Sequence, residues 1–160
     1  MQRQEPTGVR RILVVANETV AGRHLLQEIE RRAADRDHEV LVISPALAPR
    51  LKFLVSDVDG GIRAAEARMR ESVETLTRAG VTCRGEVGDS DPLLAIEDAL
   101  SQFPADEIII STHPRGRSNW LEKRVVSRAE ERFDLPLTHV VVDLEAERSE
   151  MPAGMRGGAA

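Results

Sequence analysis

Residues 106–124, with the sequence DEIIISTHPRGRSNWLEKR, decide both the fold and the candidate site of this chain. The stretch opens with three consecutive isoleucines, as in a buried strand, and runs through a polar, basic turn into a helical pattern near Ser118. In a parallel sheet, such a turn aims the free N–H groups and the positive end of the helix back over the strand. His113, Arg115 and Arg117 add cationic side chains there. We therefore predict a site for an anion such as phosphate, with a solvated surface loop as the alternative.

The rest of the chain alternates apolar runs with amphipathic helical patterns. Continuous apolar runs, typical of central strands, occur at residues 12–16 and 40–43. An alternating pattern over residues 81–87 predicts a half-exposed edge strand, and a last strand is expected at residues 138–142. Residues 45–58 are expected to form a loop with little regular structure. The expected helix limits are Thr19 as an N-cap, Gly60-Gly61 before the second helix, Gly80 as its left-handed stop, Asp91-Pro92 as a start, and Pro136 as a stop.

This β-α-β-α-β-α-β-α-β order predicts the fold class. Apolar strands that alternate with amphipathic helices predict one α/β domain with a five-stranded parallel sheet, right-handed crossovers and helices on both faces. The domain is expected to cover residues 11–143. Residues 1–10 and 144–160 are expected to be a disordered lead and a disordered tail, because the tail is charged and then rich in glycine and alanine.

The composition excludes several classes of function. The 160 residues carry a net charge of −5 and only one Trp, three Phe and no Tyr, which disfavours a nucleic-acid partner. No apolar run reaches the roughly 18–20 residues that a membrane span needs. Cys83 is the single cysteine, so no internal disulfide can form, and its place in an alternating strand favours a small core residue over a reactive thiol. The expected location is the cytoplasm.

Motifs of known catalytic or metal sites do not occur in the sequence. It has no Walker A loop, GxGxxG fingerprint, HExxH, CxxC pair or GxSxG elbow. The acid pairs at residues 57 and 59 and at residues 89 and 91 precede helices, so helix capping explains them more simply than a metal site does. A catalytic role for His113 would need a nucleophile and an orienting partner, for which Ser111, Thr112 and Ser118 are only unremarkable candidates, so we expect His113 to contact a ligand or to be structural. No catalytic residue is assigned.

The C-terminal part of the sequence resembles a known family. The stretch IIISTHPRGRSNWLEKRVVSRAEERFDLPLTHVVV, residues 108–142, is similar to the C-terminal signature of universal stress proteins. ATP-binding members show a strand, then G-x-x-G, a spacer, G-S or G-T, a helix, a proline and a final apolar strand. The similarity extends over about residues 11–143 and includes ILVVANET at residues 12–19 and GDSDPLLAI at residues 88–96. It implies the sheet order 3-2-1-4-5 and a Rossmann-like fold of the adenine nucleotide alpha hydrolase type.

The glycine motif of the family is altered in this chain. Ser111 and Pro114 stand at the first two glycine positions, Arg124 at the third and Val125 at the Ser/Thr position. Proline has no N–H and valine cannot donate a hydrogen bond, whereas the family motif supplies donors and close backbone approach to phosphates. Asn17 aligns with the acid that contacts adenine in the family.

Two interpretations of this altered motif remain open. Either the nucleotide pocket is weakened or lost, or Arg115, Arg117 and Arg124 replace backbone donors by charge and hold a phosphate-bearing ligand. No cofactor is assigned with certainty, and ATP or another phosphate-bearing molecule is the candidate. The candidate contact residues are Asn17, Thr19, Ser111, Thr112, His113, Arg115, Gly116, Arg117, Ser118 and Arg124.

The resemblance implies a non-enzymatic stress-response or regulatory protein that acts as a homodimer. Family members often pair their last strands across a two-fold axis, and an apolar edge strand here favours such a partner. A further protein partner is not identified by the sequence. An ATP-hydrolysing or ATP-transferring enzyme is the third class, for which the sequence supplies no distinct base or metal set. The expected dimer residues are Thr138, His139, Val140, Val141 and Val142.

Overall fold

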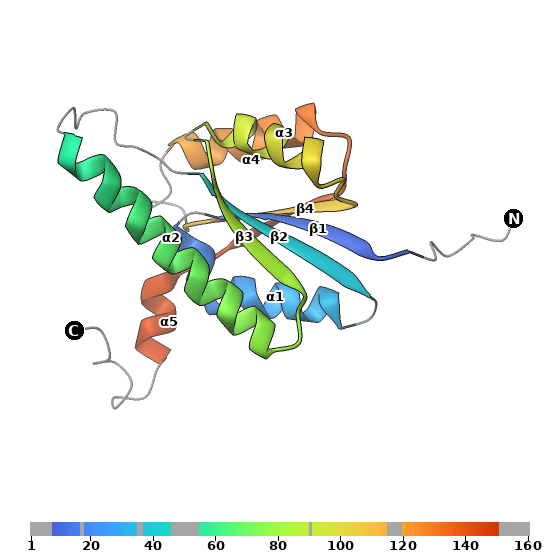
Figure 1. The fold of residues 1–160 in the computed structure, drawn as a ribbon, viewed down its shortest axis with the longest axis horizontal. Helices are drawn as coiled ribbons and strands as arrows, with labels where there is room; N and C mark the ends of the chain where they lie inside the picture. The colour runs from blue at the N-terminus through green and yellow to red at the C-terminus, as the bar shows by residue number, and fades with distance from the viewer. Residues whose placement is uncertain are drawn as a thin grey trace, which may run out of the picture.

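Five parallel strands form one sheet in the computed structural model, which describes residues 8–16, 18–34, 37–45, 55–89, 91–114 and 120–150 (Figure 1). The sheet order is β3-β2-β1-β4-β5, and every neighbouring pair is parallel. This arrangement confirms the predicted fold class and the predicted order. The strands are β1 (Arg10–Val15), β2 (His38–Pro45), β3 (Cys83–Gly88), β4 (Glu107–Thr112) and β5 (Leu137–Val141).

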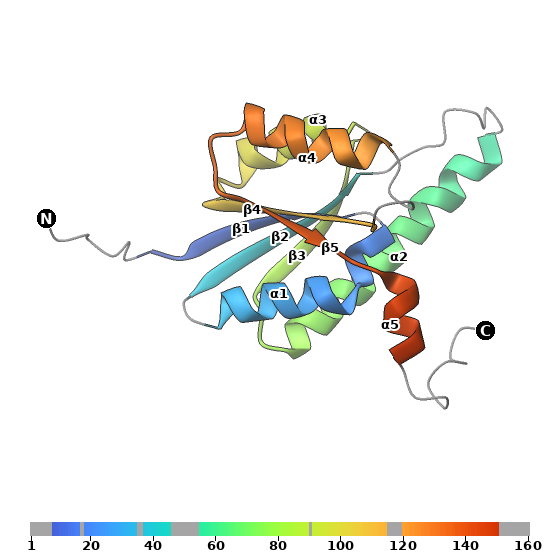
Figure 2. The ribbon, with the colours of Figure 1, turned by 180° about the vertical axis from the view of Figure 1, so that it is seen from behind.

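Helices cover both faces of the sheet. Figures 1 and 2 show α3 and α4 on one face and α1 and α2 on the other, with α5 beyond the end of β5 on the α1 side. A short 3-10 helix, η1, connects β1 to α1. The helices are η1 (Glu18–Ala21), α1 (Arg23–Ala33), α2 (Val55–Arg78), α3 (Pro92–Gln102), α4 (Trp120–Arg132) and α5 (Leu144–Glu150).

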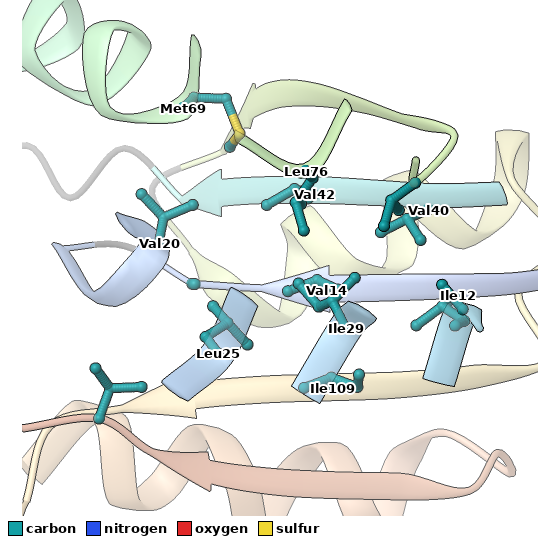
Figure 3. Close-up of a cluster of buried hydrophobic side chains, with 14 residues drawn as sticks. Ile12, Val14, Val20, Leu25, Ile29, Val40, Val42, Met69, Leu76 and Ile109 are labelled. Atoms are coloured by element: carbon teal, nitrogen blue, oxygen red, sulfur yellow. The ribbon is translucent and has the colours of Figure 1, made fainter. Parts of the chain in front are cut away.

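Two apolar clusters, one on each face, hold these layers together. The first lies under α1 and α2, and Figure 3 shows Val14 of β1, Val42 of β2 and Ile29 of α1 pointing toward one another in it. The second contains Leu13 of β1 and Ile108 of β4, packed under α3 and α4. Successive residues of β1 and β4 therefore enter opposite clusters, which is why these two strands read as unbroken apolar runs.

Two of the predicted helix limits are confirmed by their geometry. The Asp91 carboxylate accepts hydrogen bonds from the backbone N–H groups of Leu93 (3.0 Å) and Leu94 (3.5 Å), and Pro92 is the first residue of α3. Gly80, just after α2, has a φ of +88°, in the left-handed region that a residue without a β-carbon adopts readily.

Four predictions about the elements were wrong. Thr19 does not cap α1, because η1 intervenes and α1 begins at Arg23. Helix α2 begins at Val55, so the two glycines expected before it lie inside it, and the expected loop is shorter. Packing of a 24-residue helix outweighs the roughly 1 kcal/mol that each interior glycine costs. The tail was expected to be disordered from Leu144, but it begins with helix α5. Asp143 caps this helix, and Glu147 anchors it to the start of α1. Arg10, placed in the lead, is the first residue of β1.

A nearly buried ionic cluster lies under the C-terminal end of α1. Glu107, the first residue of β4, is only 3% exposed, and its Oε2 accepts hydrogen bonds from Arg10 (2.7 Å) and Arg32 (2.8 Å). Arg32 also donates to Glu28 (2.9 Å) and to the Thr138 hydroxyl of β5 (2.9 Å). Partial burial lowers the pKa of the Arg32 guanidinium, but its bonds and charge contacts with Glu28 and Glu107 outweigh this and raise it. The cluster thus ties α1 to β1, β4 and β5.

Acid is expected to weaken the fold through Glu28. The hydrogen bond from Arg31, followed by that from Arg32, lowers the pKa of Glu28 below its ordinary value of 4.5 despite partial burial. A group with a lowered folded-state pKa stabilises the fold fully above its unfolded-state value and loses that contribution as the pH falls through the folded-state value. Urea unfolding from pH 7 down to pH 3 should therefore show a shallower loss of stability for Glu28→Gln than for the wild type. Parallel pH profiles of the two proteins would contradict this.

Candidate functional site

The candidate site lies at the carboxyl ends of β1 and β4, where the sheet order reverses. The chain leaves β1 through α1 toward β2, and it leaves β4 through α4 toward β5, in the opposite direction (Figure 2). The two connections diverge here, and in open α/β sheets the crevice outside such strand ends is the usual ligand position. We call it the β1–β4 crevice. The segment after β1 contributes Thr19, and the end of β4 contributes Ser111 and Thr112.

A pair of buried hydroxyl groups forms the floor of the crevice. The Ser111 hydroxyl donates to the Thr19 hydroxyl (2.9 Å). The Thr19 hydroxyl in turn donates to the carbonyl oxygen of Ser111 (3.4 Å). Thr19 is 1% exposed and Ser111 is 6% exposed. A ligand that accepted a hydrogen bond from either hydroxyl would therefore first have to break one of these bonds.

Thr112 connects the crevice to the edge strand β5. Its hydroxyl lies 2.6 Å from Nε2 of His139, whose side chain is exposed, and its carbonyl oxygen accepts from the N–H of Val142 (2.9 Å). These two bonds anchor the end of β4 to β5 and to the residue after it. Thr112 is 5% exposed, so its side chain stabilises the fold and offers little surface to a ligand.

Gly22 and Val142 pack closely together beside Thr19, on the α1 side of the sheet. Gly22 is the N-cap residue of α1, and a β-carbon built on it would lie 2.3 Å from Cγ1 of Val142. Val142 is fully buried. The segment η1–α1 can pack this closely onto the end of β5 only because residue 22 has no side chain.

The remaining predicted contact residues lie in α4, directly after β4 or outside the described residues. Arg124 is exposed in α4, and Val125, at the Ser/Thr position of the motif, packs half-buried against the cluster under α3 and α4. His113 and Pro114 follow β4 and are half-buried. The others fall outside the described residues: Asn17, Arg115, Gly116, Arg117 and Ser118. Of the ten predicted residues, the structure brings Thr19 and Ser111 into contact, and Thr112 follows Ser111 in β4 but contacts His139.

Sequence reasoning missed two features near the crevice. The contact of Gly22 with Val142 joins residues 120 positions apart, and no local pattern marks either of them. The second is Glu147 of α5, whose carboxylate accepts from the backbone N–H groups of Arg23 and His24 at the start of α1. A charged tail segment gives no local signal for such a contact, apart from the weak capping signal of Asp143 before it.

Other candidate features lie away from the crevice. A hollow of about 280 Å³ between α3 and β3 is floored by Leu41 and Ile43 and edged by Arg84 and Asp98. Burial raises the pKa of the Cys83 thiol, with the Thr77 hydroxyl acting weakly in the other direction, as for a packed rather than a reactive cysteine. Within the described ranges, no three His, Cys, Asp or Glu side chains gather as a metal ion would require.

Solved structures with the same fold include universal stress proteins. One from Archaeoglobus fulgidus matches with a TM-score of 0.62 and 16% identity, over 83% of this chain and 98% of that one. One from Burkholderia pseudomallei matches with a TM-score of 0.59 and 15% identity, over 85% and 98%. The chain has the universal stress protein fold. A member of that family from Arabidopsis thaliana, solved with AMP bound, matches this universal stress protein-like chain with a TM-score of 0.53 and 12% identity, over 86% and 94%.

Sequence comparisons add no closer relative to these universal stress protein neighbours. No family model matches the chain, and no curated protein matches it. The identities of 12–16% to the solved structures support the fold and leave the activity to be argued from the site. None of the helices in the described part of the chain is long and apolar enough to cross a membrane.

Proposed function

We propose that this chain is a non-enzymatic regulatory protein of the universal stress protein type, in which adenine-nucleotide binding at the β1–β4 crevice is weakened. It acts as a homodimer. We place it in the cytoplasm, a compartment that keeps single thiols such as that of Cys83 reduced. The observation that carries the weakened binding is the buried pair of Thr19 and Ser111, which occupies the floor with a side chain where the family motif has glycine.

Two further residues support weakened nucleotide binding. Pro114, at the second glycine position, has no N–H to offer a phosphate. Val125 packs toward the sheet and has no hydroxyl, so the donor of the family motif is missing at that position. A universal stress protein from Archaeoglobus fulgidus was solved with dAMP and the Arabidopsis protein with AMP, so adenine nucleotides are the ligands to test.

Calorimetric titration with AMP and ATP tests the proposal. The wild type is expected to give no saturable heat up to about 1 mM nucleotide, which corresponds to less than about 4 kcal/mol of binding free energy. Restoring the motif with Ser111→Gly, Pro114→Gly, Arg124→Gly and Val125→Ser together should improve the affinity at least tenfold. Circular dichroism and urea unfolding would check that the fourfold variant is folded.

Micromolar binding by the wild type would overturn weakened binding and favour the second interpretation, in which arginines hold the phosphate. In that case, Arg115→Ala/Arg117→Ala should abolish the heat, because these side chains would replace the missing backbone donors. The matched control is Arg78→Ala/Arg84→Ala, which removes two exposed arginines from other elements. If both double variants lost the same binding heat, the net charge of the protein and not a specific site would explain the binding.

The proposed homodimer pairs β5 of one protomer with β5 of its partner. β5 is an edge of the sheet, and its exposed Val141 is an apolar residue that an unpaired edge strand seldom presents to water. The strand also presents His139, while Thr138 and Val140 are half-buried. Val142 does not belong to this edge, because it lies after β5 and is fully buried.

Replacing Val141 with glutamate is expected to break the dimer. Two carboxylates would face each other near a two-fold axis, where each also loses water. Sedimentation velocity at about 10 µM should show a dimer for the wild type and a monomer for Val141→Glu. Leu94→Glu is the control, because Leu94 is an exposed apolar residue of α3, outside β5, and its substitution should leave the dimer intact. A monomeric wild type would contradict the proposal.

A further inference from the structure

Helix α5 is attached to the rest of the chain by polar groups. None of its seven residues is buried, and Leu144 is its one member that packs, partly buried, against the cluster under α1 and α2. The Asp143 carboxylate starts the helix by accepting from the N–H groups of Glu145 and Ala146, both at 3.1 Å. Figures 1 and 2 both show α5 beyond the end of β5, near the start of α1. So little apolar contact leaves α5 dependent on its charged side chains.

Glu147 supplies the main attachment. Its two carboxylate oxygens accept from the backbone N–H groups of Arg23 (3.0 Å) and His24 (2.9 Å), which are the first two residues of α1. Its side chain is 12% exposed and lies 3.6 Å from Nδ1 of His24, and the Arg23 guanidinium forms an ion pair with Glu150. A carboxylate at a helix N-terminus satisfies free donors and complements the positive end of the helix.

α1 cannot obtain this cap locally. Its N-cap residue is Gly22, which has no side chain to accept a hydrogen bond, and the first turn of α1 contains no acidic residue. Any of the usual capping residues at position 22 would place a β-carbon 2.3 Å from Val142. The cationic Arg23 at this end of the helix is itself unfavourable unless an anion is near it. Glu147 is that anion.

The start of α1 is joined directly to the floor of the β1–β4 crevice. The N–H of Gly22 donates to the carbonyl oxygen of Thr19 (2.9 Å), and the hydroxyl of Thr19 is paired with Ser111. The η1 carbonyl of Val20 accepts from the fully buried Ser72 hydroxyl of α2 (2.8 Å). A shift of the first turn of α1 would therefore also displace Thr19, which lies three residues before Gly22.

We propose that α5 is a releasable strap that keeps the β1–β4 crevice closed. In the strapped form, Glu147 caps α1 and holds η1 where Thr19 pairs with Ser111. When the strap is released, η1 and the first turn of α1 loosen, the hydroxyl pair opens, and the crevice admits a phosphate-bearing ligand. The choice of ligand rests on the proposed function, whereas the strap rests on the contacts of Glu147.

Hydrogen exchange of backbone amides in the full chain tests the strap. Glu147→Ala should raise the exchange rates at least tenfold at Arg23 and His24, which lose their acceptor, and at Val20 and Gly22 of the η1 segment. The amide of Ile109 in β4 should keep its rate, which shows that the fold is intact. Glu74→Ala, which removes an exposed carboxylate of α2, is the matched control. A change confined to Arg23 and His24, or no change, would overturn the strap.

Titration with AMP tests what the strap controls. Glu147→Ala is expected to give saturable heat with AMP below about 1 mM, whereas the wild type and Glu74→Ala are expected to give none in that range. Equal affinities for Glu147→Ala and wild type, or no binding by either, would overturn the opening of the crevice. The wild-type affinity alone judges the proposed function, whereas the difference between the two proteins judges the strap. The two failures are therefore distinguishable.

Discussion

Replacing Gly22 with alanine is expected to lower the free energy of unfolding by about 1–3 kcal/mol, the usual cost of overpacking a core. The φ and ψ of Gly22 are −65° and 131°, which alanine adopts without strain, so the backbone is not the cause. The cost comes from the new β-carbon, which would lie 2.3 Å from Cγ1 of Val142 and 3.0 Å from the carbonyl oxygen of Thr19. Equilibrium urea unfolding followed by circular dichroism measures it.

Val142→Ala in the Gly22→Ala background supplies the decisive control. Shortening Val142 removes the colliding methyl group, so the double variant should be more stable than the sum of the two single losses predicts. Gly8→Ala is the matched glycine control, because a β-carbon there meets no atom within 4 Å, and it should be neutral. Strictly additive losses for residues 22 and 142 would show that the close packing of η1–α1 on the end of β5 is not what makes glycine necessary.

The fold could be predicted from the sequence because its signals are local. β1 and β4 are unbroken apolar runs since each enters the clusters on both faces, and β3 alternates because it is an edge. The stop at Gly80 and the start at Asp91 are each encoded within a few residues. Such local signals do not depend on contacts with residues that are distant in the sequence. The predictions that were wrong, such as the start of α2, concern segments where tertiary packing outweighs propensity.

The site could be predicted only in part, for a physical reason. Its position follows from the sheet order, and the family resemblance led to Ser111 at the first glycine position and to Thr19 in the turn after the first strand. Their mutual hydrogen bond, across 92 residues, depends on how η1 packs and has no pattern in the sequence. The contact of Glu147 with His24 spans 123 residues and falls in a charged segment that reads as a tail. Long-range polar pairing is thus the part that composition and periodicity do not reveal.

The long-range polar pairs of the buried Glu107 are likewise not revealed by the sequence. Removing Glu107 and removing its partner Arg32 should lower the free energy of unfolding by different amounts. Arg32→Met is expected to destabilise the fold by about 3 kcal/mol, toward the lower end of the range for breaking a buried ion pair. Glu107 would stay buried with Arg10 as its remaining cation, and its Oε1 has no hydrogen-bond partner in the part of the chain that the structure describes. Glu107→Leu should cost less, about 1 kcal/mol or below, because the arginine side chains it leaves are partly exposed and can reach water.

The double variant Arg32→Met/Glu107→Leu separates pairing from packing. An apolar pair of similar volume needs no compensating charge, so the double variant should recover most of the stability that Arg32→Met alone loses. Urea unfolding of the four proteins gives the coupling energy of the pair directly. Arg31→Met is the matched control, because Arg31 contacts Glu28 on the exposed side of α1 and should matter by less than about 1 kcal/mol, as surface ion pairs do. If Glu107→Leu cost as much as Arg32→Met, the buried carboxylate would be stabilising in its own right, and the cluster would be a net contributor to the fold rather than a compensated charge.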